Sequence, residues 1–228
     1  MSRSRRWAGA LAAITLAQPL HAQDARPVIL VLPFENTGSY GQDKETFQAF
    51  EVGLPAILSS ILAAHPGARV ADGGGAPERR PPGAGRRMDA ASATQLAKAA
   101  GARYAVTGSF ADFYGKFRIN ARVVDAQSGE ILKVVSNDDP KLQDRAQLGA
   151  ILQLVGERVA AAVGLPPLPA DAAARHAAVP SGALTDYSRG LMFESQGDRA
   201  KAAEAYQRAV TAAPEYQDAR TALQRVRG

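Results

Sequence analysis

The stretch that most constrains the fold is RYAVTGSFADFYGKFRINARVVDAQSGEILKVVSND, residues 103–138. In its middle, apolar and polar residues alternate strictly, as in a strand with one face on a core and one face toward water. The apolar set is Phe117, Ile119, Ala121 and Val123, and the polar set is Lys116, Arg118, Asn120 and Arg122. Gly115 and the turn-forming segment DAQSGE mark two chain reversals. The stretch therefore predicts three antiparallel strands over Ala105–Phe113, Lys116–Asp125 and Glu130–Ser136.

The segments before this stretch predict two further strands and two helices. The apolar run from Val28 through Phe34 is typical of a strand buried on both faces. A short second strand is expected at Ala68–Ala71 and a helix at Asp89–Ala100. Between the two strands, a helical stripe contains Phe47, Phe50, Leu54, Ile57, Leu58 and Ile61. Because an internal proline disfavours a helix, we expect a kink or restart at Gly53–Pro55.

A third helix, Lys141–Val163, has an apolar side that should cover the sheet. The predicted class is therefore α/β (α+β), a mixed sheet with antiparallel hairpins packed by helices, over residues 27–163. The segment Gly73–Arg87 is rich in glycine, proline and arginine and is expected to form a mobile loop.

The first 22 residues have the layout of a cleavable secretory signal. Arg3, Arg5 and Arg6 precede an apolar run from Trp7 to Ala17, and the segment ends at small Ala22. The alternative is a disordered or membrane-anchoring N-terminus. The apolar run is too short to span a membrane, and we expect no membrane-spanning helix in the rest of the chain.

Charge and cysteine content restrict the functions that the chain can have. Cleavage would remove three arginines and no acidic residue, which lowers the formal charge from +5 to +2. A chain so close to neutrality does not indicate nucleic-acid binding. The absence of cysteine excludes thiol catalysis, disulfides and a lipidated cysteine, so membrane attachment would have to come through a partner.

The C-terminal part has a different pattern. Residues 164–182 contain four prolines and no sustained period, which predicts a linker. Residues 183–228 contain small and aromatic residues at the intervals of a single tetratricopeptide (TPR) repeat followed by a trailing helix, although the usual early tryptophan is missing. The matching residues are Gly190, Phe193, Gly197, Ala202, Tyr206, Ala209 and Pro214. The predicted fold thus ends in a TPR-like helical hairpin.

A single repeat of this kind cannot bury its own apolar faces. The hairpin must either dock on the α/β domain of its own chain or stack against another protein. In the second case we expect Tyr187, Leu191 and Glu194 to contact the partner, and in the first case these residues belong to the core.

No group of residues in the sequence predicts catalysis. His65 and His176 have no evident partner for acid–base or metal chemistry. Asp112, Asp125, Asp138 and Asp139 lie at strand ends, where acidic residues form turns. The glycines at 73–75 lack the spacing of a phosphate-binding loop. We therefore expect no enzymatic activity, no cofactor and no metal site.

Four fragments carry a resemblance to a known family: ILVLPFENTG, GLPAILSSILAAHPGARV, LAKAAGARYAVTGSF and KFRINARVVDAQSGEIL. Together, over residues 27–163, they resemble the α/β domain shared by the curli-export family (CsgG), the flagellar-associated outer-membrane family (FlgO) and the N-terminal domain of TolB. The resemblance implies a non-enzymatic envelope protein used in assembly, secretion or recruitment. The chain lacks the lipoprotein cysteine of the curli-export proteins, and its hairpins are too short for membrane strands of about 9 to 11 residues.

The sequence thus predicts a periplasmic adaptor, associated with the outer membrane through its partners, that acts by protein–protein contacts in the assembly of the envelope or a surface appendage. The expected partners are envelope proteins that contact the face of the TPR-like hairpin. A homo-oligomer is left open. Two alternatives remain: an activator of a cell-wall synthase, and a periplasmic sensor of small molecules or glycans.

Overall fold

The structure is a computed structural model that describes residues 26–38, 43–71, 88–137 and 141–228. Within these ranges the strands are β1 (Val28–Asn36), β2 (Arg69–Val70), β3 (Tyr104–Phe113), β4 (Lys116–Asp125), β5 (Ile131–Ser136) and β6 (Gln143–Asp144). The helices are α1 (Lys44–Ala63), α2 (Ala90–Ala99), α3 (Leu148–Ala162), α4 (Ala170–Ala177), α5 (Ser181–Ser195), α6 (Arg199–Ala212) and α7 (Gln217–Arg227), with a 3-10 turn at Arg145–Gln147.

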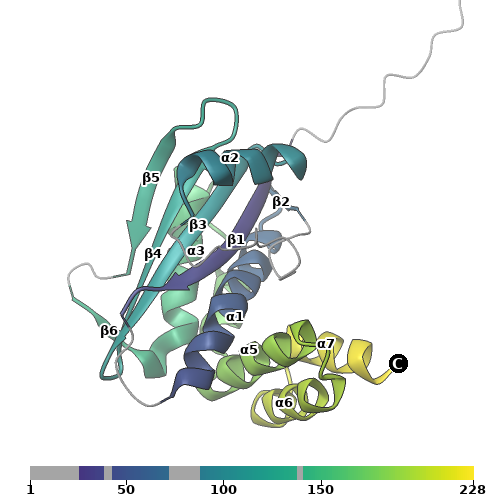
Figure 1. Ribbon diagram of the computed structural model, residues 1–228. Helices are drawn as coiled ribbons and strands as arrows, with labels where there is room; N and C mark the ends of the chain where they lie inside the picture. Colours follow the sequence, from purple (N-terminus) through teal and green to yellow (C-terminus); the bar gives the residue numbers. More distant parts are fainter. Residues whose placement is uncertain (1–25, 39–42, 72–87, 138–140) are drawn as a thin grey trace, which may run out of the picture.

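The described strands form one mixed sheet in the order β2-β1-β3-β4-β5, with β6 paired to the far end of β4. β1 runs parallel to β2 and to β3, whereas β3 pairs with β4, and β4 with β5, in antiparallel fashion. β3 and β4 pair without interruption from Tyr104↔Asp125 to Phe113↔Lys116. The predicted mixed sheet with antiparallel hairpins is therefore confirmed (Figure 1).

Helices cover the two faces of the sheet unequally (Figure 1). α1 and α3 pack on one face and bury the apolar side of β4, and the largest core cluster lies between them and the sheet. α2 packs on the other face, where a smaller cluster includes Leu30, Ala97, Ala105 and Val124. The sequence predicted a wet face there. The tertiary structure covers one end of it, because α2 lies across β1, β3 and β4 at that end.

Several predicted boundaries are confirmed and three are wrong. α2 begins after Asp89, whose carboxylate caps Ser92 N at 2.7 Å, and it ends before Gly101 at φ 65°. α1 continues through Pro55, so the predicted restart at Gly53–Pro55 is wrong. The second strand is shorter than predicted. The third helix begins at Leu148 and not at Lys141, because Gln143 and Asp144 pair with β4 as strand β6.

α1 is the one described helix that is long and apolar enough to cross a membrane. No such segment was expected after the N-terminus. In the fold, α1 packs between β1 and α3 on one side and α5 on the other, and 61% of its apolar window is buried. Its apolar surface is therefore used in the core of the molecule.

The segment predicted as a linker contains helix α4, which packs on α3. Gly149 of α3 permits this contact, because a Cβ atom there would lie 2.9 Å from His176 O. At one end of the segment, His65 Nε2 donates to Pro166 O at 2.7 Å. At the other end, Ser181 Oγ donates to Ala146 O at 2.7 Å. These contacts join residues far apart in sequence, and local composition did not predict them.

Four predictions concern residues outside the described ranges. They are the signal segment 1–22, the loop 73–87, and the turn roles of Asp138 and Asp139.

Candidate protein-interaction surface

The C-terminal helices, here called the helical module (residues 181–228), dock on the α/β domain of their own chain (Figure 1). α5 lies directly against α1, and Gly53 is a point of tight approach. A Cβ atom at Gly53 would lie 2.0 Å from Ser188 Oγ and 2.8 Å from Ser188 Cα. Of the two arrangements left open by the sequence, the structure adopts docking on the same chain.

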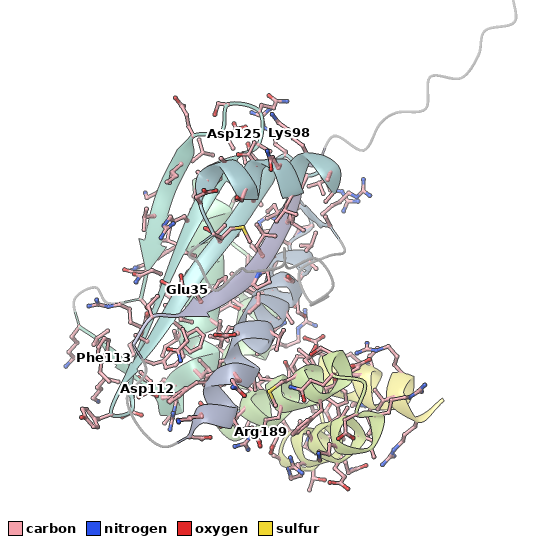
Figure 2. All side chains as sticks on the ribbon, in the orientation of Figure 1. Glu35, Lys98, Asp112, Phe113, Asp125 and Arg189 are labelled. Atoms are coloured by element: carbon pink, nitrogen blue, oxygen red, sulfur yellow. The ribbon has the colours of Figure 1, made fainter. Side chains whose placement is uncertain are left out.

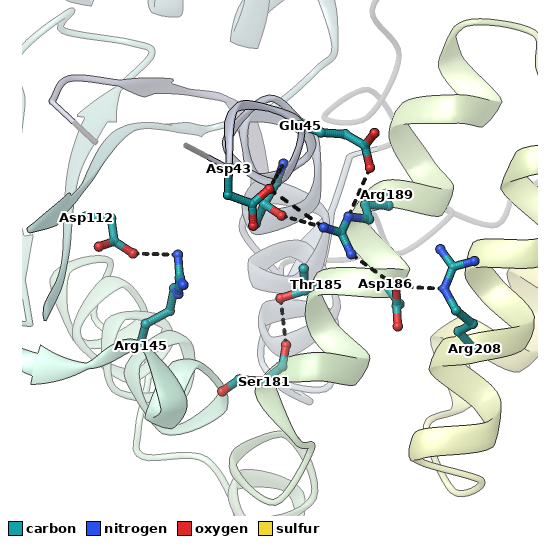
Figure 3. Close-up of polar contacts among 10 residues, drawn as sticks. Asp43, Glu45, Asp112, Arg145, Ser181, Thr185, Asp186, Arg189 and Arg208 are labelled. Carbon is teal, nitrogen blue, oxygen red and sulfur yellow. Dashed lines mark hydrogen bonds and ion pairs between the residues drawn. The ribbon is translucent and has the colours of Figure 1, made fainter. Parts of the chain in front are cut away.

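Arg189 of α5 connects the helical module to the start of α1 (Figure 3). Its guanidinium lies 3.2 Å from Glu45 Oε1 and donates to Thr46 Oγ1 at 2.8 Å. It also lies 3.7 Å from Asp43 Oδ1 and 3.5 Å from Asp186 Oδ1. No local pattern singles out Arg189, because three of its four partners, Asp43, Glu45 and Thr46, are about 145 positions away in the chain.

Tyr187 belongs to a tyrosine cluster inside the helical module. The side chain is only 8% exposed, and its ring lies 5.8 Å from the ring of Tyr206 and 5.2 Å from that of Tyr216. Burial raises the pKa of all three phenols above its ordinary value of 10. Leu191 is partly buried and packs against the same core.

Glu194 forms the polar end of this cluster. Its carboxylate accepts two hydrogen bonds from the Arg225 guanidinium, both at 2.8 Å, and one from the Tyr206 hydroxyl at 2.6 Å. The bond from Arg225 is the largest cause that holds the pKa of Glu194 below its usual value. Tyr187, Leu191 and Glu194 thus make contacts within the module, and their role as partner-binding residues stays a prediction.

Two of the predicted turn-forming acids have that role in the structure. Asp112 Oδ1 accepts from Gly115 N at 2.6 Å, and Asp125 Oδ1 accepts from Gln127 N at 2.7 Å. Asp112 is also paired with Arg145, and Asp125 with Arg103. The two carboxylates lie at opposite ends of the β3–β4 hairpin and do not form a pair (Figure 2).

The histidines also have structural contacts. Buried His65 receives a hydrogen bond from Gly67 N on Nδ1 at 3.0 Å, opposite its bond to Pro166, and His176 Nε2 lies 3.5 Å from Ser60 Oγ. Among the described residues, no group of three or more His, Asp or Glu side chains is arranged to hold a metal ion. Catalysis remains untested by these contacts.

Three exposed apolar side chains lie together on β5, at the edge of the sheet (Figure 1). Ile131 is 47% exposed, Leu132 43% and Val134 57%. In the described part of the chain, the only other large hydrophobic residue so exposed is Tyr114. The sequence predicted partner contacts on the face of the TPR-like hairpin. The exposed apolar group on β5 lies instead at the opposite side of the α/β domain from the helical module, where α5 and α1 cover each other.

Three cations surround the exposed part of β5. Arg122 lies opposite Val134 in the β4–β5 register, and Lys133 lies opposite Val123. Arg158 of α3 donates to Ser136 O. Within the described ranges, none of the three forms an ion pair. The surface therefore combines apolar side chains with positive charge.

No known family profile and no curated protein match the sequence. Among solved structures, TolB from Acinetobacter baumannii aligns with a TM-score of 0.41 and 16% identity, over 62% of this chain and 29% of that chain. The C-terminal domain of LpoB from Salmonella enterica aligns with a TM-score of 0.36 and 16% identity, over 49% of this chain and 80% of that domain.

A lipoprotein from Neisseria meningitidis aligns with a TM-score of 0.34 and 22% identity, over 60% of this chain and 93% of that one. The present chain spans less than a third of the aligned TolB chain. All three alignments have TM-scores below 0.5 and concern the fold alone.

Proposed function

We propose that this protein is a non-catalytic adaptor of the bacterial envelope that acts through protein–protein contacts. The observation that carries the proposal is the exposed edge strand β5, where three large apolar side chains lie beside cations that form no ion pair with any described residue. Exposed apolar residues that gather in one place mark interaction sites more often than isolated ones do. The export signal predicted over residues 1–22 places this surface in the periplasm.

The helical module supports the proposal in a different way. Its docking on α1 through Gly53 and Arg189 makes it part of one body with the α/β domain. A partner bound to β5 would thus be held at a set distance from any partner bound to the module. Two separate surfaces on one rigid body are what an adaptor needs.

Site-specific photo-crosslinking in intact envelopes tests the adaptor function. A photoreactive amino acid would replace, one at a time, Val134 on β5, Gln207 on α6 and Arg220 on α7. Discrete adducts with a protein at any of these positions support the proposal. The absence of adducts at every position, or a turnover reaction in the purified protein, would overturn it.

The sensor alternative is best tested at a cavity of about 360 Å³ on α6 and α7. It is lined by Ala203, Glu204, Gln207, Arg208 and Arg227. Arg208 is already paired with Asp186, and Arg227 donates to Gln207. The cell-wall synthase alternative would be supported if the crosslinked partner were such an enzyme.

A further inference from the structure

We propose that β5 accepts an additional β-strand from a partner, and that this strand alternates apolar side chains with at least one carboxylate. The inference rests on the proposed adaptor function and names the surface and the chemistry of the partner. It concerns the backbone of β5 as well as its side chains.

The backbone of β5 is open on one side. β5 pairs with β4 from Ile131 to Ser136, and no described strand pairs with its other side. An edge strand presents unpaired N–H and C=O groups to any extended chain that approaches it. The guanidinium of Arg158 already donates to the carbonyl oxygen of Ser136. The backbone that remains open to a partner strand therefore extends from Ile131 to Val135.

The side chains of β5 would provide contacts for the added strand. Ile131, Leu132 and Val134 are all close to half exposed. In strand addition, hydrogen bonds along the main chain supply affinity, and alternate side chains supply specificity. An incoming strand with apolar residues beside Leu132 and Val134 would remove both from water.

Charge defines the partner more closely. Val134 shares its sheet face with Arg122, because residues directly opposite each other in an antiparallel pair project to the same side. Lys133 is exposed on the strand itself, and Arg158 lies at its end. A carboxylate on the incoming strand would find a cation that has no ion pair within the described part of the chain.

A second copy of this chain is a poor occupant. If β5 paired with itself about a two-fold axis centred on Lys133, the two lysines would lie directly opposite each other. Like charges directly opposite on neighbouring strands are destabilising. β5 also contains a register shift opposite Val123 and Val124, and bulges and lysines protect sheet edges from self-pairing.

The test uses a displayed library of random peptides of about ten residues, the length of an ordinary strand. The full-length protein serves as bait, and the selected peptides are sequenced and synthesised. We expect alternating apolar residues with a carboxylate among the selected peptides. We also expect slower amide hydrogen exchange at residues 131–135 in the complex, which contacts made only by side chains would not produce.

Two charge reversals distinguish binding at β5 from non-specific attraction between the peptide and the charge of the whole protein. Lys133→Glu should weaken binding of the selected peptide about tenfold, which corresponds to about 1.4 kcal/mol. Arg220→Glu makes the same charge change at an exposed position of α7 and should leave binding unchanged. Both positions are exposed, so both variants should keep the melting temperature of the wild type. N-methylation of the peptide backbone should abolish binding.

The inference is overturned if no peptide is selected, if the selected peptides carry no carboxylate, or if they protect amides elsewhere. It is also overturned if the two charge reversals have equal effects, or if size-exclusion chromatography shows a dimer that Lys133→Glu changes. The adaptor function survives any of these results if crosslinked partners appear at Gln207 or Arg220. Conversely, peptide binding at β5 without any crosslinked protein in envelopes would contradict the adaptor function alone.

Discussion

Two aromatic clusters in the described part of the molecule have similar ring spacings but differ in their polar contacts. In the α/β domain, Phe50, Phe110 and Phe117 pack with ring centroids 5.7 to 6.1 Å apart and carry no polar group. In the helical module, Tyr187, Tyr206 and Tyr216 pack at 5.2 to 5.8 Å, and Glu194 and Arg225 contact the cluster through Tyr206. The first cluster depends on shape and burial alone. The second depends also on hydrogen bonds and charge, so it should respond to pH and to the loss of single oxygen atoms.

The largest effect is expected in the apolar cluster's own sheet, from Gly108→Val. A Cβ atom at Gly108 would lie 2.4 Å from Phe34 Cζ, and Phe34 is fully buried and cannot move aside. We expect the free energy of unfolding to fall by about 3 kcal/mol. Urea denaturation measures it. A loss of less than about 1 kcal/mol would show that this core is not tightly packed.

Gly53→Ala tests the contact between the α/β domain and the helical module. The added methyl group would clash with Ser188, and we expect a net loss of about 2 kcal/mol despite the better helix propensity of alanine. Limited proteolysis should cleave residues 164–182 faster, because the helical module is displaced from α1. Gly182→Ala is the control, since nothing lies within 4 Å of a Cβ atom there. Adding Ser188→Gly to the variant should restore part of the stability.

The tyrosine cluster should give effects of opposite sign for the same chemical change. Tyr206→Phe removes the 2.6 Å hydrogen bond to Glu194 and should cost about 1 kcal/mol. The Tyr216 hydroxyl is buried and has no hydrogen-bond partner among the described residues, so Tyr216→Phe should be neutral or stabilising. Thermal unfolding of both variants checks this. Equal losses would mean that the Tyr216 hydroxyl is also hydrogen-bonded.

Acid should weaken the helical module through Glu194. The pKa of Glu194 in the folded state is lowered, chiefly by the bond from Arg225, from an ordinary value of 4.5. Its contribution is therefore complete above pH 4.5 and is lost as the pH falls through the folded-state pKa. Arg225→Ala should make the fall in stability between about pH 5 and pH 3 shallower than in the wild type. Unfolding curves across this range would contradict the expectation if the two slopes were equal.

The smallest effect is expected from Asp125→Asn. The amide oxygen can still accept from Gln127 N, so the turn is kept, and only the partly exposed ion pair with Arg103 is lost. We expect a change in stability of about 0.5 kcal/mol and no change in peptide binding. A large functional loss in this stably folded variant would indicate that Asp125 takes part in an enzymatic reaction and would contradict the adaptor function.

Short-range patterns in the sequence predicted the antiparallel hairpins, the turn roles of Asp112 and Asp125, the helix at Asp89–Ala100 and the helical pair near the C-terminus. These features depend on the alternation of neighbouring residues and on bonds that span two or three positions. The sequence did not predict β6, helix α4 or the contacts of Arg189 with the start of α1. Each of these is held by partners between about 25 and 145 positions away, for which a single sequence has no periodic signal.

The sequence by itself determined which segments form strands and helices, because period, capping and turn chemistry act between near neighbours in the chain. Only the tertiary structure decided which apolar surfaces are buried and which stay in contact with water. α1 and α5 cover each other, and Tyr187 turns inward, whereas β5 is left at the edge of the sheet with Leu132 and Val134 in contact with water. The physical reason is that the pattern of apolar residues in the sequence does not depend on whether a distant element covers them in the fold. Burial is a property of the whole fold.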